Sequence, residues 1–427
     1  MAREHKAGLR LARAVRDQVE FQMACLDDLI GSEHRARQVM AYVEGLDLSL
    51  LYNEVRSVEG APGQARTDPA ILMAVWLYAT LEGVGSARHL GRLIETDAAY
   101  RWLMGGVCTN HHTLSDFRTA AGPCLDAALS ASIAALVTAG LVTLDALAVD
   151  GVRVRASAGK KSFKRKAKLQ EQHQIATAHV AALKVELDLD PAASQTRVAA
   201  RRKAAGDDRV ARIEAALAAA GEIAQARVES AKKSRHKPPG DDDNGVSGGG
   251  PTASSTDPDA RIMRMPDGGW RPAYNLQVST DPQSGVMLGL EAIASGSDRG
   301  KLGPAAEQAR RRYAAAPKRM LADAGYDSKS DIAAREAEGI AIYCPLPAND
   351  RPRAGEPEGV TLWRARMQSE AGAAVYARRF ACERPHADMR NRGLHRFTVR
   401  GLRKVKAVAL WFVHAHNCLT IARLKAA

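Results

Sequence analysis

Five residues in three separated segments carry side chains that together could do phosphoryl chemistry. Asp150 lies near the end of the strand-like run LDALAVDGVRVRA, and Asp323 lies in the run MLADAGYDS. Tyr376, Arg379 and Glu383 follow one another at spacings of three and four in a segment predicted to be helical. At about 100° per residue these three positions fall within an arc of about 60°, so they share one face of that helix.

The three carboxylates provide the hard oxygen ligands that Mg²⁺ or Mn²⁺ prefers. Two such ions about 4 Å apart could activate a water or a 3′-hydroxyl and stabilise the leaving oxygen of a phosphodiester. However, the chain has 48 acidic residues, and an aspartate at a strand end commonly forms a cap or a turn. Spacing alone therefore leaves a metal site and a structural role open as alternatives.

The charge of the chain points to a polyanionic partner. Its 427 residues carry a net charge of +13, with 46% apolar residues, which excludes a wholly disordered chain. Residues 151–240 hold 20 Lys and Arg against 9 Asp and Glu, and residues 371–427 hold 12 against 2, which leaves the remainder at −8. Two basic blocks are typical of two surfaces that contact phosphate backbones. Solvated helical faces remain the alternative, above all for the first block, whose charges alternate in sign.

Cysteine usage and hydropathy indicate the compartment. The six cysteines lie far apart without a C-x-x-C spacing, which favours a reducing cytoplasm over a disulfide framework or a zinc cluster. No uninterrupted apolar run reaches the roughly 18 residues of a membrane span. The first 20 residues lack the apolar core of a secretory signal. We therefore expect a cytoplasmic protein with no membrane partner.

The elements that position these residues fall into a helical and a mixed part. Residues 1–140 predict short helices, which fit a plain bundle or a helix-turn-helix DNA reader. Their predicted N-caps are Asp68, Ser86 and Thr96, and Thr113-x-x-Asp116 resembles a capping box. A strand is predicted after Leu144, followed by two antiparallel helices over 160–236 that break near Pro191.

The remainder predicts a mixed sheet. Residues 237–256 are rich in Gly, Pro, Ser and Asp and predict a flexible linker. Beyond it, two strands flank the turn 282–285, and a helix, a third strand, a second helix and a fourth strand follow. Helices over 368–383 and 401–424 end the chain. This order indicates an α/β fold, with 141–159 and 257–427 forming one domain around the helical insertion.

The sequence around the three acids resembles that of the DDE transposases of bacterial insertion sequences. The matching blocks occur in the family's order and cover nearly the whole chain, as ILMAVWLYATLEGVGSARHL, AVDGVRVRA, PAYNLQVSTD, LADAGYDS and RNRGLHRFTVRGLRKVKA. The third catalytic block resembles the signature Tyr-x2-Arg-x3-Glu-x6-Lys, with Tyr376, Arg379 and Glu383 in place. Agreement of many blocks is far more specific than any one of them.

The resemblance implies a fold, an activity and a cofactor. The fold would be a ribonuclease H-like mixed sheet, interrupted by the helical hairpin and preceded by an all-α domain that binds DNA ends. Asp150, Asp323 and Glu383 would hold two Mg²⁺ ions, for which Mn²⁺ could substitute. The protein would nick terminal inverted repeats and join the 3′-hydroxyl to double-stranded target DNA by in-line phosphoryl transfer, without a covalent protein intermediate. A homodimer on paired ends, acting on the bacterial nucleoid, is expected.

The resemblance also implies residues that contact DNA. Tyr376 and Arg379 would hold phosphates near the cleaved end. Arg390 stands where the family has lysine, and a planar guanidinium replaces a point charge there. Pro385 is expected to kink or end the helix just beyond Glu383. A basic run around residue 400 could track a DNA backbone, and from it we select Arg396 and Arg400.

Two other functions stay open. A DNA-binding protein derived from a transposase but without catalysis would look similar, although all three acids are present here. A nuclease that cuts without joining would carry the same site.

Overall fold

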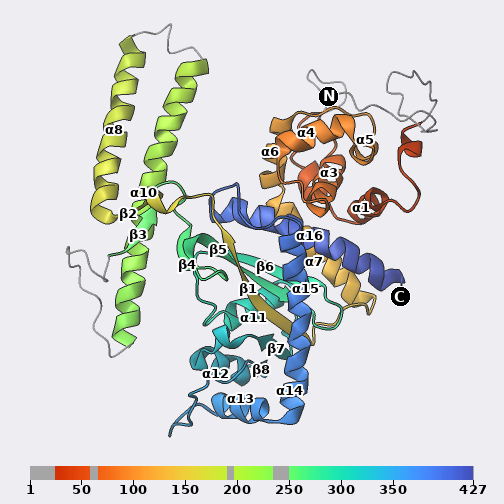
Figure 1. Ribbon diagram of the computed structural model, residues 1–427, viewed down its shortest axis with the longest axis vertical. Helices are drawn as coiled ribbons and strands as arrows, with labels where there is room; N and C mark the ends of the chain where they lie inside the picture. Colours follow the sequence, from red (N-terminus) through yellow and green to blue (C-terminus); the bar gives the residue numbers. More distant parts are fainter. Residues whose placement is uncertain (1–24, 58–65, 190–196, 234–249, 427) are drawn as a thin grey trace, which may run out of the picture.

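Three regions are visible in the computed structural model, which describes residues 25–57, 66–189, 197–233 and 250–426 (Figure 1). A group of short helices comes first, a mixed sheet covered by helices forms the centre, and a long helical hairpin stands apart from both. The first 20 residues, on which the secretory-signal prediction rests, lie outside the described residues.

The first region consists of short helices, several of which have a side-chain cap at the N-terminus. Its elements are η1 (Leu26–Leu29), α1 (Arg35–Glu44), α2 (Ser49–Tyr52), α3 (Pro69–Leu81), α4 (Ala87–Thr96), α5 (Ala98–Met104), α6 (His111–Ala120) and α7 (Gly122–Thr138). Asp68 and Ser86 cap α3 and α4 as predicted, because their side chains accept hydrogen bonds from first-turn amides.

Two predicted caps in this region were wrong. Asp97, not Thr96, caps α5, and its carboxylate accepts from the amides of Ala99 and Tyr100. Asn110 caps α6 by accepting from the Thr113 amide, so Thr113 lies inside the first turn instead of before it. In both places an Asp or Asn side chain reaches the free amides of the first turn, and the neighbouring threonine is not needed there.

The central sheet has six strands around β1 (Ala146–Arg155). The others are β4 (Arg261–Arg264), β5 (Trp270–Thr280), β6 (Met287–Ile293), β7 (Arg319–Ala322) and β8 (Ala341–Tyr343), in the order β4-β5-β1-β7-β8 with β6 also paired to β5. β1 runs antiparallel to β5 and parallel to β7, and β7 runs parallel to β8. The predicted hairpin is confirmed as β5 and β6. Helix α11 (Leu302–Tyr313) leads from β6 to β7, and α12 (Lys329–Ala337) connects the parallel neighbours β7 and β8.

The insertion after β1 is a helical hairpin tied to the core by a small sheet. Its helices are α8 (Lys166–Leu189) and α10 (Arg197–Lys233), and residues 190–196 between them lie outside the described residues. At the base, η2 (Lys160–Ser162) leads into β2 (Phe163–Arg165), which pairs antiparallel with β3 (Thr252–Ser254).

The small sheet corrects the predicted linker 237–256. Residues 252–254 form β3, because the buried Ala253 packs with Leu169 and with alanines of α10 at the base of the hairpin. Residues 237–249, on which the prediction of flexibility mainly rests, lie outside the described residues.

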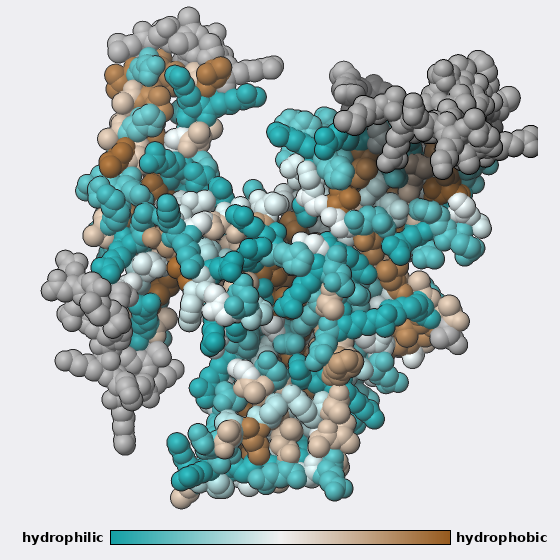
Figure 2. All heavy atoms as spheres, viewed as in Figure 1, coloured by the Kyte–Doolittle hydropathy of each residue, from teal (hydrophilic) through white to brown (hydrophobic). Residues whose placement is uncertain are grey.

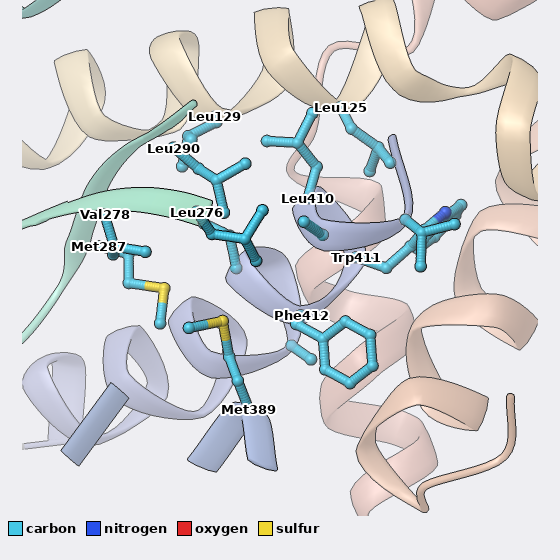
Figure 3. Packing of buried hydrophobic residues seen from close by; sticks show 14 of the residues in the cluster. Leu125, Leu129, Leu276, Val278, Met287, Leu290, Met389, Leu410, Trp411 and Phe412 are labelled. Carbon is cyan, nitrogen blue, oxygen red and sulfur yellow. The ribbon is translucent and has the colours of Figure 1, made fainter. Parts of the chain in front are cut away.

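One helix, α16 (Leu402–Ala426), joins the two parts of the core. It packs against α7 and α3 on one side and against β6 on another, so a single apolar cluster runs from the first helices into the sheet. Figure 3 shows Leu410, Trp411 and Phe412 of α16 among side chains from α7, β5 and β6. The first helices therefore have no separate hydrophobic core, because their apolar side chains pack against α16 and share its cluster with the sheet.

The burial of α16 explains its unusual composition. By length and composition this helix could cross a membrane, and the bent pair α6 and α7 passes the same test together. The predicted absence of an uninterrupted apolar run of about 18 residues is not contradicted, because charged and polar side chains interrupt α16. In the fold, however, 83% of the apolar window of α16 is buried inside the protein. Its hydropathy reflects contact with protein on most sides.

Three polar side chains of α16 are satisfied within this core. His414 contacts the Tyr42 hydroxyl through Nδ1 at 2.9 Å and the Leu125 carbonyl through Nε2 at 2.8 Å. His416 contacts the Asp388 carboxylate and the Gly285 carbonyl instead, each at 2.9 Å. The Asn417 side chain bonds both the amide and the carbonyl of Met287. As expected from their spacing, the two histidines face different partners.

The segment 358–391 departs from the single helix predicted over 368–383. It comprises α13 (Glu358–Gln368), α14 (Glu370–Ala377), the 3-10 helix η4 (Arg378–Cys382) and α15 (Glu383–Asn391). Ser369 caps α14 and ends α13, and η4 turns the buried Cys382 toward Ala148 and Leu321 of the sheet. The expected kink at Pro385 was also wrong. Pro385 lies in the first turn of α15, where no intrahelical amide is lost.

His414 makes the stability of the fold depend on pH. Burial lowers the pKa of His414 to about 4 from 6.5, because the charged ring would lose its hydration in the core. Between pH 6.5 and 4, His414 binds a proton in the unfolded chain but not in the folded protein. We therefore expect the free energy of unfolding to fall as pH drops from 6.5 toward 4. Urea unfolding across this range should show a smaller slope for His414→Gln than for the wild type. Equal slopes would contradict the prediction.

Candidate active site

The register of the sheet brings Asp150 and Asp323 together. The parallel pairing of β1 and β7 ends at Val149 opposite Ala322. The next residues along the two strands are Asp150 and Asp323, so their carboxylates emerge side by side where β7 stops. The chain turns there because Asp323 caps the 3-10 helix η3 (Ala324–Tyr326) through the Gly325 amide at 2.8 Å. Asp150 and Asp323 are therefore neighbours in the fold. The predicted position of Asp150 near the end of its strand was wrong, because β1 continues to Arg155 through its pairing with β5.

The two carboxylates have opposite pKa shifts. Burial raises the pKa of the Asp323 carboxyl, and the neighbouring charge of Asp150 raises it further. Burial also opposes ionisation of Asp150. There, hydrogen bonding and attraction from His386, the Gly151 amide and Arg379 outweigh it, so the pKa of Asp150 is lowered. Asp150 is therefore the carboxylate that stays ionised more easily, and the repulsion between the two like charges appears as the raised pKa of Asp323.

Arg379 links Asp150 to the third predicted acid. Its Nη1 lies 3.3 Å from Oδ2 of Asp150, and its Nη2 lies 3.9 Å from Oε1 of Glu383. The Arg379 and Asp150 side chains are 18% and 17% exposed, whereas that of Glu383 is 55% exposed. Glu383 begins α15 and Arg379 lies in η4, so the single helix face predicted for them does not exist. The contact survives because η4 still places them within one turn.

The other residues predicted to contact DNA fall into two places. Tyr376, in α14, interacts electrostatically with Arg379 and packs with the apolar cluster that contains Cys382. Arg390 lies on α15 seven residues after Glu383, and therefore on the same helix face about 10 Å along its axis. Arg396 and Arg400 lie in the loop after α15 and contact the distal end of β1 and the residues beyond it, away from the acids.

His386 is a member of the site that sequence reasoning missed. Its Nδ1 lies 3.4 Å from Oδ2 of Asp150, and its side chain is 10% exposed. It stands three residues after Glu383, so it shares a face of α15 with that acid. This spacing was the available signal. The proline between them obscured it, because it predicted the end of a helix instead of its first turn.

Asp298 is a fourth acid near the pair, and no motif predicted it. Its Oδ1 accepts hydrogen bonds from Asn275 at 2.6 Å and Gln277 at 2.7 Å, and Arg153 lies 3.4 Å from its Oδ2. Its charge contributes to the raised pKa of Asp323. Asp298 reaches this position from the loop after β6, and only the fold brings that loop to the end of β7.

Comparison with known families identifies the chain. Residues 251–418 match the family model of the transposase DDE domain, and residues 11–120 match that of a transposase domain of the first region. The chain is a DDE transposase of insertion sequences. No curated protein and no solved structure matches it. The DDE match includes Asp323 and Glu383, whereas Asp150 precedes it, because the helical hairpin separates β1 from the rest of the sheet.

The donor set of the transposase suits a divalent cation. Carboxylate oxygens are the ligands that Mg²⁺ and Mn²⁺ prefer, and a cation between Asp150 and Asp323 would relieve the repulsion that raises the pKa of Asp323. Within the described residues, no three His, Cys, Asp or Glu side chains are already grouped closely enough to hold a metal. Arg379 lies among these acids instead. The pair fits a metal, and Glu383 would have to move to join it.

The opposite pKa shifts predict opposite effects on stability in the metal-free transposase. Asp150→Asn removes the partner of Arg379 and His386, and we expect it to destabilise the fold at pH 7 by about 1–3 kcal/mol. Asp323→Asn removes a charge that opposes folding above its raised pKa, so it should increase the melting temperature at pH 7. Thermal unfolding in chelator measures both. The benefit of Asp323→Asn should disappear near pH 3, where the wild-type carboxyl is protonated, and a decrease at pH 7 would refute this assignment.

Gly151 is required by the polar side chains packed over it. A Cβ at this position would lie 2.5 Å from Oδ1 of Asp298 and 2.9 Å from Nε2 of Gln277. Gly151→Ala should therefore displace Asp298 and destabilise the transposase by about 1–3 kcal/mol. Gly140→Ala provides no matched control, because its backbone is left-handed, whereas Gly159→Ala meets no atom within 4 Å. Urea unfolding should show a loss for Gly151→Ala that is absent for Gly159→Ala.

Proposed function

We propose that this transposase binds terminal inverted repeats and catalyses metal-dependent cleavage and strand transfer of double-stranded DNA. The observation that carries the proposal is the adjacency of Asp150 and Asp323 at the end of β7, with Arg379 and Glu383 above them. The sheet supports the same assignment. Three antiparallel strands, β6, β5 and β1, continue into the parallel β7 and β8, which is the arrangement of a ribonuclease H-like fold.

Asp150, Asp323 and Glu383 would hold the divalent cations, two Mg²⁺ ions for which Mn²⁺ could substitute. When bound, such ions polarise the scissile phosphate and lower the pKa of the attacking water or 3′-hydroxyl. Asp150 is prepared for this task, because His386 and Arg379 keep it ionised despite its burial. Asp323 is prepared as well, since a cation would offset its repulsion from Asp150.

Arg379 and Tyr376 would position the DNA. In the free protein Arg379 pairs with Asp150 and contacts Glu383, so its guanidinium supplies the positive charge that the metal ions would otherwise supply to these acids. Arriving DNA brings a phosphate with which the guanidinium can form a bidentate pair. Arg379 would then turn from Asp150 to the phosphate, beside Tyr376, and leave Asp150 and Glu383 to the metal. Arg390 would contact the same DNA strand about two helical turns along α15.

The remaining parts of the proposal concern assembly and place of action. The helices within 1–140 would bind the DNA ends, and the chain would work as a homodimer on paired ends in the bacterial cytoplasm, on the nucleoid. The sheet with its flanking helices, within 141–159 and 257–427, would be the catalytic domain, and 160–236 a basic insertion. The net charge of +13 supports a nucleic-acid partner for the chain.

The test is an in vitro cleavage and strand-transfer assay on labelled duplexes from the element's own ends. Glu383→Gln should lower product formation by at least about 100-fold, because loss of a ligand exceeds the 10–100-fold effect typical of outer-shell partners. Glu370→Gln, at an exposed glutamate in the first turn of α14, is the matched control and should retain wild-type activity. Chelation of the metal should abolish the product in every case. Product that survives in Glu383→Gln would mean that another carboxylate is the third ligand.

A second function is favoured by one observation, the pairing of Arg379 with the acids. If this ion pair persists on DNA, the protein binds without catalysis, as a repurposed transposase would. Wild-type protein that binds the end duplex but forms no product with Mg²⁺ or Mn²⁺ would support this alternative. A nuclease that cuts without joining is distinguished by a pre-cleaved end, whose 3′-hydroxyl it would fail to transfer to a second duplex.

A further inference from the structure

The two basic blocks of the sequence meet at the distal end of β1. Arg155, the last residue of β1, forms a parallel bridge with Arg396. The Arg155 amide donates to the His395 carbonyl at 3.3 Å, and the Phe397 amide donates to the Arg155 carbonyl at 2.8 Å. Two residues after Arg155, the Ser157 carbonyl accepts from Nε of Arg400 at 3.2 Å. The block 151–240 and the block 371–427 therefore share one surface.

This surface continues to the base of the helical hairpin. We call it the basic strip, and it consists of Arg155, Lys160, Lys161, Arg165, Arg396 and Arg400. All six side chains are exposed. The backbone between them is held firmly, because Ser162 bonds the Ser254 hydroxyl at 2.7 Å and β2 pairs with β3. Figure 2 shows mainly hydrophilic residues where the hairpin meets the core.

The cations of the basic strip have no carboxylate partners within the described part of the chain. None of the six forms an ion pair there, unlike Arg364, which binds both Asp350 and Glu356. Arg400 attracts Asp257 without forming an ion pair with it, and Asp257 and Asp259 are already engaged by other groups. Asp257 accepts from the Tyr274 hydroxyl and the Gly401 amide, and Asp259 accepts from the Leu402 amide. Cations without an ion-pair partner on a rigid surface repel one another until a polyanion neutralises them.

We infer that the basic strip binds the phosphate backbone of duplex DNA at the base of the hairpin, outside the acid site. This inference rests on the proposed function for the nature of the polyanion, and on the bridge and the unpaired cations for its location. From residue 155 to residue 161 the chain spans at most about 20 Å, which corresponds to about six base pairs at 3.4 Å each. Contacts of this kind fix the position of a duplex without reading its sequence.

The experiment measures binding without catalysis. Fluorescence anisotropy in chelator, on a duplex that lacks the element's end sequence, gives the affinity between 50 and 200 mM salt, about the range over which phosphate contacts weaken strongly. The test variant combines Lys160→Gln, Lys161→Gln and Arg396→Gln. The control combines Arg201→Gln, Arg202→Gln and Lys203→Gln, three exposed cations on α10 away from the base of the hairpin. Both variants change the net charge equally, and circular dichroism verifies their folding.

The expected result is specific to the strip. The test variant should bind about tenfold more weakly or worse, with a slope of log affinity against log salt shallower by between about 2 and 3, because each phosphate contact contributes about 0.9. The control should keep the wild-type slope. Equal losses in both variants would overturn the inference, since they would reflect net charge alone. Loss of binding to vesicles of anionic lipid, with duplex binding unchanged, would identify a membrane surface instead and would also overturn it.

A second measurement needs no variant. Acetylation of the wild-type protein, followed by mass spectrometry, should show Lys160 and Lys161 protected by the duplex while Lys203 stays reactive. Unchanged reactivity of Lys160 and Lys161 would overturn the inference. The outcome is independent of the proposed chemistry. If the protein binds DNA without cleaving it, Lys160 and Lys161 should still be protected. If it cleaves DNA but these lysines are not protected, the proposed function stands and the inference about the basic strip is wrong.

Discussion

The fold depends on the burial of one apolar helix. α16 is the last element of the chain, yet it supplies apolar side chains both to the first helices and to the sheet. Without α16, helices α3 and α7 would expose the faces that now pack against it. The hydrophobic effect thus makes the first and last parts of the chain a single cooperative unit. The position of α15, and with it Glu383 and His386, is fixed by the same packing, because Met389 of α15 is buried beside α16.

The acid site is organised by compensation of charge. Burying Asp150 and Asp323 side by side is unfavourable. Arg379 and His386 contact Asp150 directly, whereas Arg379 only weakly offsets the charge of Asp323. The second carboxylate keeps its unfavourable position. Such residual strain is common where groups are arranged for chemistry instead of stability. The segment from α14 to α15 carries both compensating side chains, Arg379 and His386. Their contacts with Asp150 hold this segment over the end of β7.

Much of this architecture could be predicted from local patterns. The strands around Asp150 and Asp323 alternate or are continuously apolar, and the caps at Asp68 and Ser86 follow from short-range hydrogen bonding. The break of the predicted helix over 368–383 could not be predicted, because η4 forms to bury Cys382 against the sheet, a tertiary contact. Asp298 was beyond reach for the same reason. Its neighbours Asn275 and Gln277 belong to another strand, and nothing in the sequence near Asp298 identifies them.

The insertion of the helical hairpin has a consequence for how the chain folds. β1 and β5 are central neighbours, yet Arg155 and its partner Ala273 are 118 positions apart. Closing a longer loop adds only about 0.6 kcal/mol for each doubling of its length, so the equilibrium cost is small. The kinetic cost is reduced too, because α8 and α10 can pair locally and then β2 and β3 can close their base. The hairpin would thereby bring the ends of β1 and β5 together before the central sheet forms. An insertion whose own pairing brings its two ends together can be gained, lost or exchanged without changing how the flanking strands β1 and β5 pair.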